Sequence, residues 1–293
     1  MDACHNRRHD GGCRPLRCLR RSLTSILMLL LAATVATAQI TPRLKNISLC
    51  NGEDRTTPDP QINGCTALID SGDEPAHTVA VAYNNRGNAR AAKGEYDLAI
   101  KDYDAAIKVN PESSSPFNNR GVAYKKKGDF DRALQDFDQS LKLNPMYAGA
   151  YANRAGVYES KGQFDLAAKD YGEAIKVAPT LQAVWNGRCW SRAIIGELDE
   201  ALTDCNEALR LAPKDTAALD SRGFAYLKKG QLDLAIADYS SALELNPKLA
   251  TALYGRGLAK LKKGDVSNAN SDIAAAKEIA ANIASDFARY GIQ

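Results

Sequence analysis

The sequence predicts an all-α fold, a solenoid of six helix-turn-helix repeats. Two observations predict it: marked residues return at an interval of 34, and each copy holds two stretches whose apolar residues have helical spacing. Internal repeats with a period of this size are typical of proteins in which each unit buries its apolar face against the next.

Glycine, alanine and proline mark the repeat. Glycine recurs at Gly94, Gly128, Gly162, Gly196, Gly230 and Gly264, and alanine at Ala99, Ala133, Ala167, Ala201, Ala235 and Ala269. Proline recurs at Pro111, Pro145, Pro179, Pro213 and Pro247, and the last copy has Ala281 at this place.

Each copy is expected to form two helices with a sharp turn between them. In the second copy, Phe117, Gly121 and Tyr124 lie at i, i+4 and i+7, on one face of a first helix. Gly128 follows a lysine-rich last turn, and glycine readily takes the left-handed conformation that ends a helix. Pro145 ends the second helix because proline has no amide hydrogen to donate.

The filled positions of this pattern resemble the tetratricopeptide repeat family. An aromatic residue or leucine opens each copy, and a small residue follows four positions later: Tyr83 and Gly87, Phe117 and Gly121, Tyr151 and Ala155, Trp185 and Cys189, Leu219 and Gly223, Leu253 and Gly257. The family's tyrosine remains at Tyr124, Tyr158 and Tyr226, and Arg90, Arg192 and Lys260 replace it elsewhere. The resemblance implies a right-handed solenoid that binds protein or peptide in a groove lined by its first helices.

The repeats and their flanks divide the chain into nine predicted segments. They are an export signal (1–38), an N-terminal loop and capping helix (39–79), six repeats (80–113, 114–147, 148–181, 182–215, 216–249 and 250–283) and the C-terminal end of a closing helix (284–293). The ends of a solenoid need such covers because the terminal repeats have no neighbour on one side.

Residues 1–38 are typical of an export signal. Six arginines precede a short apolar run over 23–35, and Ala-Thr-Ala at 36–38 forms a small-residue cleavage pattern before Gln39. The apolar run is shorter than the roughly 20 residues of a membrane span. The protein is therefore expected in the periplasm or secreted, with no stable membrane anchor after cleavage.

The net charge of +3 comes from this leader, which holds six arginines and two acids. The remaining residues carry 32 basic and 33 acidic side chains, so the charge gives no indication of nucleic-acid binding. The leader also holds Cys4, His5, His9, Cys13 and Cys18. Their spacing matches no zinc pattern, and neither a metal site nor a cofactor is predicted.

Four cysteines remain after the leader, an even number that favours pairing in an oxidising compartment. Cys50 and Cys65 flank a predicted loop, 51–64, and a disulfide is expected between them; the alternative is a buried thiol at Cys65 and an unconstrained one at Cys50. The same segment is expected to supply a single helix that covers the first repeat. Cys189 and Cys205 lie on the two helices of the fourth repeat, where a disulfide or two small buried side chains would fit.

Every copy carries an arginine on its first helix, where the family usually has leucine, and an aspartate on its second. The arginines are Arg86, Arg120, Arg154, Arg188, Arg222 and Arg256, and the aspartates are Asp102, Asp136, Asp170, Asp204, Asp238 and Asp272. The equal numbers favour ion pairs between helices over an arginine ladder for an anionic ligand. We expect each aspartate to reach the arginine of the following repeat, as from Asp102 to Arg120, with the arginine of its own repeat as the alternative.

The concave groove is the predicted binding surface. By the resemblance, its N-terminal part presents Asn84, Asn88, Ser115, Asn118 and Lys125, and its C-terminal part presents Trp190, Phe224, Leu227, Tyr254, Leu258 and Leu261. Amides suit an extended peptide backbone and the apolar row suits a helical segment, although these side chains could instead pack against neighbouring first helices. Family members that clamp a terminal carboxylate place basic residues beside asparagines. Asn88 and Asn119 match that pattern, but Asn84, Gly149 and Asn153 fill the basic positions, so this ligand is rejected.

No catalytic residues are predicted. His77 is the only histidine after the leader, so a histidine-dependent triad or a multi-histidine metal site would have to run through this one linker residue. The sequence therefore predicts a non-catalytic scaffold of the cell envelope that binds protein or peptide. The alternatives are an accessory subunit of an envelope or cell-wall enzyme, which would gather His77 with acids in a pocket, and a self-associating structural array.

Overall fold

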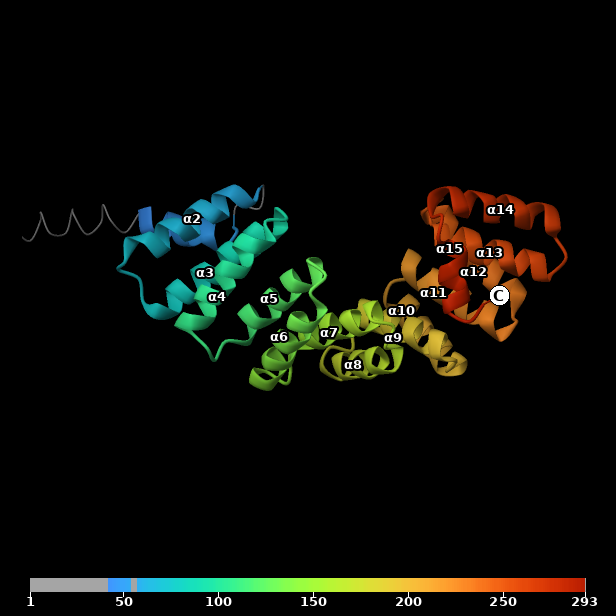
Figure 1. Ribbon diagram of the computed structural model, residues 1–293, viewed down its shortest axis with the longest axis horizontal. Helices are drawn as coiled ribbons and strands as arrows, with labels where there is room; N and C mark the ends of the chain where they lie inside the picture. The colour runs from blue at the N-terminus through green and yellow to red at the C-terminus, as the bar shows by residue number, and fades with distance from the viewer. Residues whose placement is uncertain (1–41, 54–56, 293) are drawn as a thin grey trace, which may run out of the picture.

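The computed structural model describes residues 42–53 and 57–292 (Figure 1). The predicted export signal, with its cysteines and histidines, lies outside these residues. The described residues form an all-α solenoid of helix-turn-helix repeats, and no β-strand is present among them. In Figure 1 the repeats follow a curved path from the blue N-terminal helices, through α6 to α9, to the red C-terminal helices.

Six helix pairs succeed one another along the described chain. They are α3 (Ala76–Ala92) with α4 (Tyr96–Val109), α5 (Ser114–Lys126) with α6 (Phe130–Leu143), α7 (Ala148–Ser160) with α8 (Phe164–Val177), α9 (Gln182–Ile195) with α10 (Leu198–Leu211), α11 (Thr216–Lys229) with α12 (Leu232–Leu245), and α13 (Ala250–Lys262) with α14 (Val266–Ile279). A short last helix, α15 (Ile283–Arg289), follows them.

The N-terminal cover differs from the single helix that we expected. Residues 42–50 are helical, and α2 (Pro58–Ser71) begins inside the segment predicted as a loop. Proline occupies the first helical position of α2, where its missing amide hydrogen costs nothing because that amide has no partner inside the helix. The cover is therefore two helical segments, and α2 packs on α3.

The turn glycines adopt the conformation expected of them. All six have positive φ, from 73° at Gly162 to 98° at Gly196. At Gly128 (φ 79°) the chain reverses while the amide of Asp129 donates to the carbonyl of Tyr124. A residue with a Cβ is strained in this conformation, so glycine sets the sharp turn between the helices of a pair.

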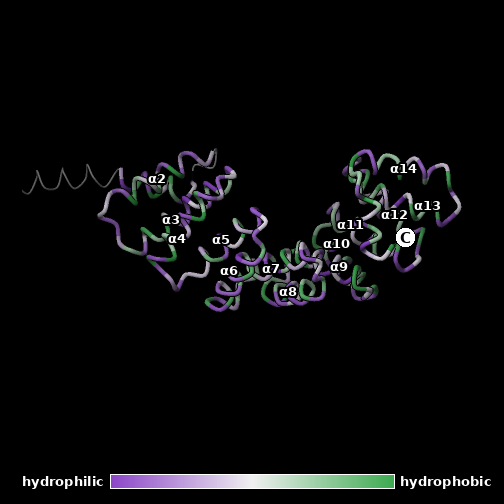
Figure 2. The backbone as a smooth tube through the Cα atoms, in the orientation of Figure 1, coloured by the Kyte–Doolittle hydropathy of each residue, from purple (hydrophilic) through white to green (hydrophobic). Residues whose placement is uncertain are grey.

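The curvature follows from which helices touch. Each first helix contacts the first helix of the next repeat, from α3 through α13, whereas no two second helices are in contact within the described chain. The first helices therefore crowd on the inner side of the curve and the second helices spread on the outer side. Figure 2 shows hydrophobic and hydrophilic residues mixed along every helix, as expected when each helix buries only one face.

The small residue on each first helix leaves room for an aromatic ring from a second helix. A Cβ added at Gly121 would lie 2.7 Å from the ring of Phe137, which is fully buried. Gly87 faces Tyr103 in the same way, at 2.5 Å. This close approach explains why small residues recur at this position of the repeat.

The arginine–aspartate ladder forms within repeats, so our prediction of pairs between repeats was wrong and the alternative is confirmed. The Nε and Nη2 of Arg154 donate to the two carboxylate oxygens of Asp170, each at 2.7 Å, and the other five pairs follow the same register. Helical spacing identifies the face of the second helix that carries the aspartate. It does not identify which of the two flanking first helices that face meets, and packing places it against the first helix of its own repeat.

The same arginines also reach the preceding repeat through their remaining nitrogen. Nη1 of Arg154 donates to Asp138 at 2.6 Å, and Nη1 of Arg222 donates to Asn206 at 2.8 Å. The corresponding position before Arg188 is Gly172, which has no side chain to accept such a bond. The arginines therefore do link neighbouring repeats, but through a residue two positions after the aspartate.

A second series of ion pairs links the repeats at the turns. Lysines at the ends of first helices pair with acids at the start of the preceding second helices: Lys93 with Asp59, Lys127 with Asp97, Lys161 with Asp131, Lys229 with Asp199 and Lys263 with Asp233. The fourth repeat has Ile195 at the lysine position. The junction of the third and fourth repeats therefore lacks two bonds that the other junctions have. Gly172 offers no acceptor to Arg188, and Ile195 replaces the lysine of the turn series.

Basic residues at the family's tyrosine position give three aspartates a second cation. Arg90 pairs with Asp102, Arg192 with Asp204 and Lys260 with Asp272, at 2.7 to 2.8 Å. Burial acts to raise the pKa of Asp272, but the bonds and charges of Arg256 and Lys260 outweigh it and lower that pKa. For Asp136, burial outweighs Arg120, and the pKa of this carboxyl is raised.

The cysteine pair that was expected to bond, Cys50 and Cys65, and the pair for which two alternatives were open, Cys189 and Cys205, are both placed at disulfide distance. The Cα atoms of Cys50 and Cys65 are 4.5 Å apart, which ties the helical segment 42–50 to α2. Those of Cys189 and Cys205 are 5.3 Å apart, which ties α9 to α10. All four side chains are buried.

Candidate functional site

The concave face begins with a connected chain of asparagine amides across three repeats. Asn153 donates to Asn118, Asn118 donates to Asn119, and Asn119 donates to both Asn84 and Asn88. These bonds measure 3.0 to 3.1 Å. The sequence patterns identified the individual asparagines but not their linkage, which requires side chains 35 residues apart to meet across adjacent first helices.

Asn88 is the exposed end of this chain. Its Oδ1 accepts bonds from Asn119 and from the hydroxyl of Tyr103, at 3.0 and 2.9 Å. These two bonds orient its amide nitrogen, which donates to no other described group and lies at an exposed position. A pre-oriented amide donor of this kind can bond the carbonyl of an extended peptide.

Two half-buried charges occupy the middle of the concave face. Glu159 on α7 accepts hydrogen bonds from Ser191 at 3.0 Å and from Tyr171 at 3.2 Å. Burial raises the pKa of Glu159 and lowers that of Lys125 on the neighbouring helix α5. The two opposite charges face the same region, so each partly offsets the cost of burying the other.

The C-terminal part of the concave face is covered by the protein's own chain. The ring of Phe287 lies 4.9 Å from that of Tyr254 and 5.7 Å from that of Phe224, and the ring of Tyr290 lies 5.3 Å from that of Trp190. We name residues 283–292 the C-terminal segment. Its Ile283, Phe287 and Ile292 are buried.

This covering was not predicted from the sequence. The predicted groove residues Trp190, Phe224, Leu227, Tyr254 and Leu258 all belong to, or pack against, one apolar cluster that includes the C-terminal segment. The repeat pattern indicated where these side chains lie on their first helices. It did not indicate that the predicted closing segment, 284–293, folds back over them.

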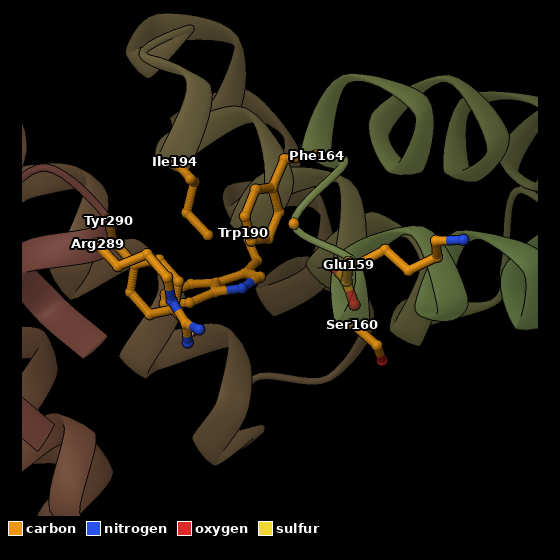
Figure 3. Close-up of a pocket in the computed structure, with 9 residues that line it drawn as sticks. Glu159, Ser160, Phe164, Trp190, Ile194, Arg289 and Tyr290 are labelled. Carbon is orange, nitrogen blue, oxygen red and sulfur yellow. The ribbon is translucent and has the colours of Figure 1, made fainter. Parts of the chain in front are cut away.

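A hollow of about 650 Å³ remains where the C-terminal segment ends. Trp190 and Ile194 of α9, Glu159 and Ser160 of α7, and Arg289 and Tyr290 of the C-terminal segment line it, together with Phe164 (Figure 3). In Figure 3 the rings of Trp190 and Tyr290 lie side by side, and Glu159 is on the opposite wall. First-helix residues therefore form much of the wall of this concavity, as expected of a scaffold.

His77 lies in a different, smaller hollow. This hollow measures about 140 Å³, and the described residues that line it include Asn84, Asn110 and Ser113 but no acid. Within residues 42–53 and 57–292, no group of histidine, cysteine or acidic side chains could hold a metal ion. In the same part of the chain, no helix has the length and apolar character needed to cross a membrane.

The paired helices and the crowding of the first helices on the inner side define an α-solenoid of helix-turn-helix repeats. A family model described as a TPR repeat matches residues 87–128 and 223–264. Two models described as a tetratricopeptide repeat match residues 115–147 and 148–181. Residues 87–181 and 223–264 therefore carry repeats of the tetratricopeptide repeat family.

Solved structures of the same architecture come from several proteins. YrrB, described as a TPR protein with an unusual peptide-binding site, is 23% identical with a TM-score of 0.51, over 64% of this chain and 95% of its own. PilF of Pseudomonas aeruginosa is 15% identical with a TM-score of 0.62, over 73% and 99%. A tetratricopeptide repeat protein of Parabacteroides merdae is 19% identical with a TM-score of 0.62, over 86% and 98%. These similarities concern the fold, and no curated protein sequence matches this chain.

Proposed function

We propose that this protein is an exported, non-catalytic scaffold that binds a polypeptide partner in the cell envelope. The observation that carries the proposal is the chain of asparagine amides along the open N-terminal part of the concave face, from Asn153 to Asn88. YrrB, one of the structures of similar fold, is described as a TPR protein with an unusual peptide-binding site. The sequence pattern of an export signal at residues 1–38 supports the proposed location in the envelope.

The amides suit an extended segment of a partner. Each peptide unit has one donor and one acceptor, and side-chain amides can satisfy both without selecting particular side chains. Nearby Lys125, which is half-buried, adds a cation beside this row. An extended segment with an acidic residue near Lys125 is the ligand that this arrangement favours.

The proposal also assigns no catalysis to the protein. The hollow that contains His77 brings no acid to the histidine among the described residues, which disfavours an enzyme subunit that uses this segment. A general base needs a partner that orients it and a substrate within hydrogen-bond reach.

Site-specific photo-crosslinking in intact cells tests the binding face. A photoreactive residue at Asn88 is expected to capture a discrete polypeptide, and one at Lys142, exposed on the second helix α6, is the matched control. Capture that is equal at both positions, or absent at Asn88, would contradict the proposed face. N-terminal sequencing of the protein from an envelope fraction is expected to begin at Gln39, and an intact leader on cytoplasmic protein would contradict export.

A further inference from the structure

The C-terminal segment has the form of a docked amphipathic helix. Ile283 and Phe287 lie at i and i+4 on one face of α15, and Tyr290, the residue directly after the helix, follows at i+7. This is the pattern by which short helices bind apolar grooves of other proteins. The face meets Phe224, Tyr254 and Trp190 on three successive first helices.

The groove also provides a cation at the end of this helix. Nζ of Lys228 donates to the carbonyl of Tyr290 at 3.1 Å and to that of Ile194 at 2.8 Å. A helix leaves its last carbonyls without partners inside the helix, and a cation there interacts favourably with the helix dipole. Lys228 therefore binds the C-terminal end of a helix. Any helix of the same length that lies in the same direction would present such a carbonyl.

Few polar contacts hold the segment in place. The side-chain hydrogen bonds of Ser285 and Arg289 stay within or beside α15, to Asn282, Asp286 and Tyr290. Among the described residues, the bond from Lys228 is the one hydrogen bond recorded between the groove and this segment. Apolar contact thus supplies most of the attachment, and another helix with the same apolar face could replace it.

The connection to the last repeat permits such a replacement. Residues 280–282, Ala-Ala-Asn, join α14 to α15, and Ala281 stands where five other copies have proline. Ala281 is exposed, and its neighbour Asn282 is exposed as well. The link is therefore not buried under other elements, and the C-terminal segment can leave the groove without opening the repeats.

We propose that the concave groove of the last three repeats receives a short amphipathic helix from a partner protein, and that the C-terminal segment occupies this groove as an internal competitor. The proposal rests on the proposed binding function and adds the class of ligand: a helix with apolar or aromatic residues at i, i+4 and i+7 whose end reaches Lys228. Because the competitor is tethered, its effective concentration is about millimolar, and a partner's apparent affinity falls accordingly.

A synthetic peptide of residues 281–293 with a fluorescent label serves as the probe, and anisotropy with the full chain is the readout. The double variant Phe287→Ala/Tyr290→Ala weakens the internal competitor without altering the groove. It is expected to bind the probe at least tenfold more tightly than the wild type does. Ala288→Ser, at an exposed position of the same helix, is the matched control and is expected to bind as the wild type does.

Three results would overturn the inference. The first is a folded double variant, verified by circular dichroism, that does not bind the probe. The second is equal affinity of the double variant and the wild type. The third is a wild-type mass that doubles with concentration in light scattering, because a second copy would then supply the segment. Should the double variant unfold, Phe287→Leu tests the same competition with a smaller change. Crosslinking at Asn88 does not involve the C-terminal segment, so failure here leaves the proposed function standing.

Discussion

Loss of the Asp170 carboxylate is expected to destabilise the solenoid far more than loss of the Asp138 carboxylate, although both accept bonds from Arg154. Asp170 is 4% exposed and accepts two bonds of 2.7 Å, whereas the side chain of Asp138 is 61% exposed and accepts one bond. Asp170→Ala leaves a guanidinium that is only 20% exposed without its main partner.

The structure sets the size of the two effects. Removing one member of a buried ion pair typically costs 3 to 5 kcal/mol, and partial access of Arg154 to water places Asp170→Ala near the lower end, at about 3 kcal/mol. A solvent-exposed pair contributes less, so Asp138→Ala is expected to cost under about 1 kcal/mol. Arg154→Leu introduces the residue that the family usually has, and it leaves Asp170 buried and unpaired.

Urea unfolding followed by far-ultraviolet circular dichroism measures all four proteins of this cycle. Arg154→Leu/Asp170→Ala is expected to cost about 2 kcal/mol less than the sum of its single variants, because no buried unpaired charge remains and Asp138, which loses its bond from Arg154, is exposed to water. The dependence of the unfolding free energy on urea concentration is compared between the variants first. Equal slopes show that the same part of the chain unfolds in each, which is necessary because repeat proteins can unfold in segments. Equal costs for the two aspartate variants, or additive costs in the cycle, would refute the reasoning.

Three further predictions concern other parts of the chain. Burial raises the pKa of Asp220 to about 7. The native state therefore keeps a proton that the unfolded chain loses near pH 4, and the free energy of unfolding falls as pH rises from about 4 to 7. Asp220→Asn is therefore expected to raise the thermal midpoint at pH 8 and not at pH 4; no gain at pH 8 would contradict this. Gly172→Ala should stabilise the third repeat by about 1 kcal/mol through helix propensity. Gly172→Asp gains only about 0.3 kcal/mol from propensity, and a pair with Arg188, whose Nη1 lies 3.6 Å from a Cβ at this position, should add up to about 1 kcal/mol. Urea midpoints measure both gains, and a Gly172→Asp midpoint no higher than that of the wild type would contradict the pair. Alkylation of envelope protein without reductant should leave Cys50 and Cys65 unlabelled, and labelling of both would exclude the disulfide.

Within the repeats, the sequence was sufficient for the features that depend on residues within a few turns of one another, whereas the helical start of α2 at Pro58 was missed. The helix ends at Gly128 and Pro145 follow from backbone conformation alone, and the small residue at Gly121 follows from the periodicity of the first helix. The in-register series of arginines and aspartates likewise indicated that these residues are coupled. All of these signals are local, so an interval of 34 residues repeats them without reference to the rest of the fold.

Only the tertiary structure decided which surfaces meet. It paired Asp170 with Arg154 and not with Arg188. The second helix that carries Asp170 lies between two first helices, and helical spacing alone does not distinguish between their arginines; packing does. It also placed the C-terminal segment over Phe224, where burial of Phe287 removes apolar surface from water. Such choices depend on competing contacts between residues far apart in the chain, and no local pattern encodes them.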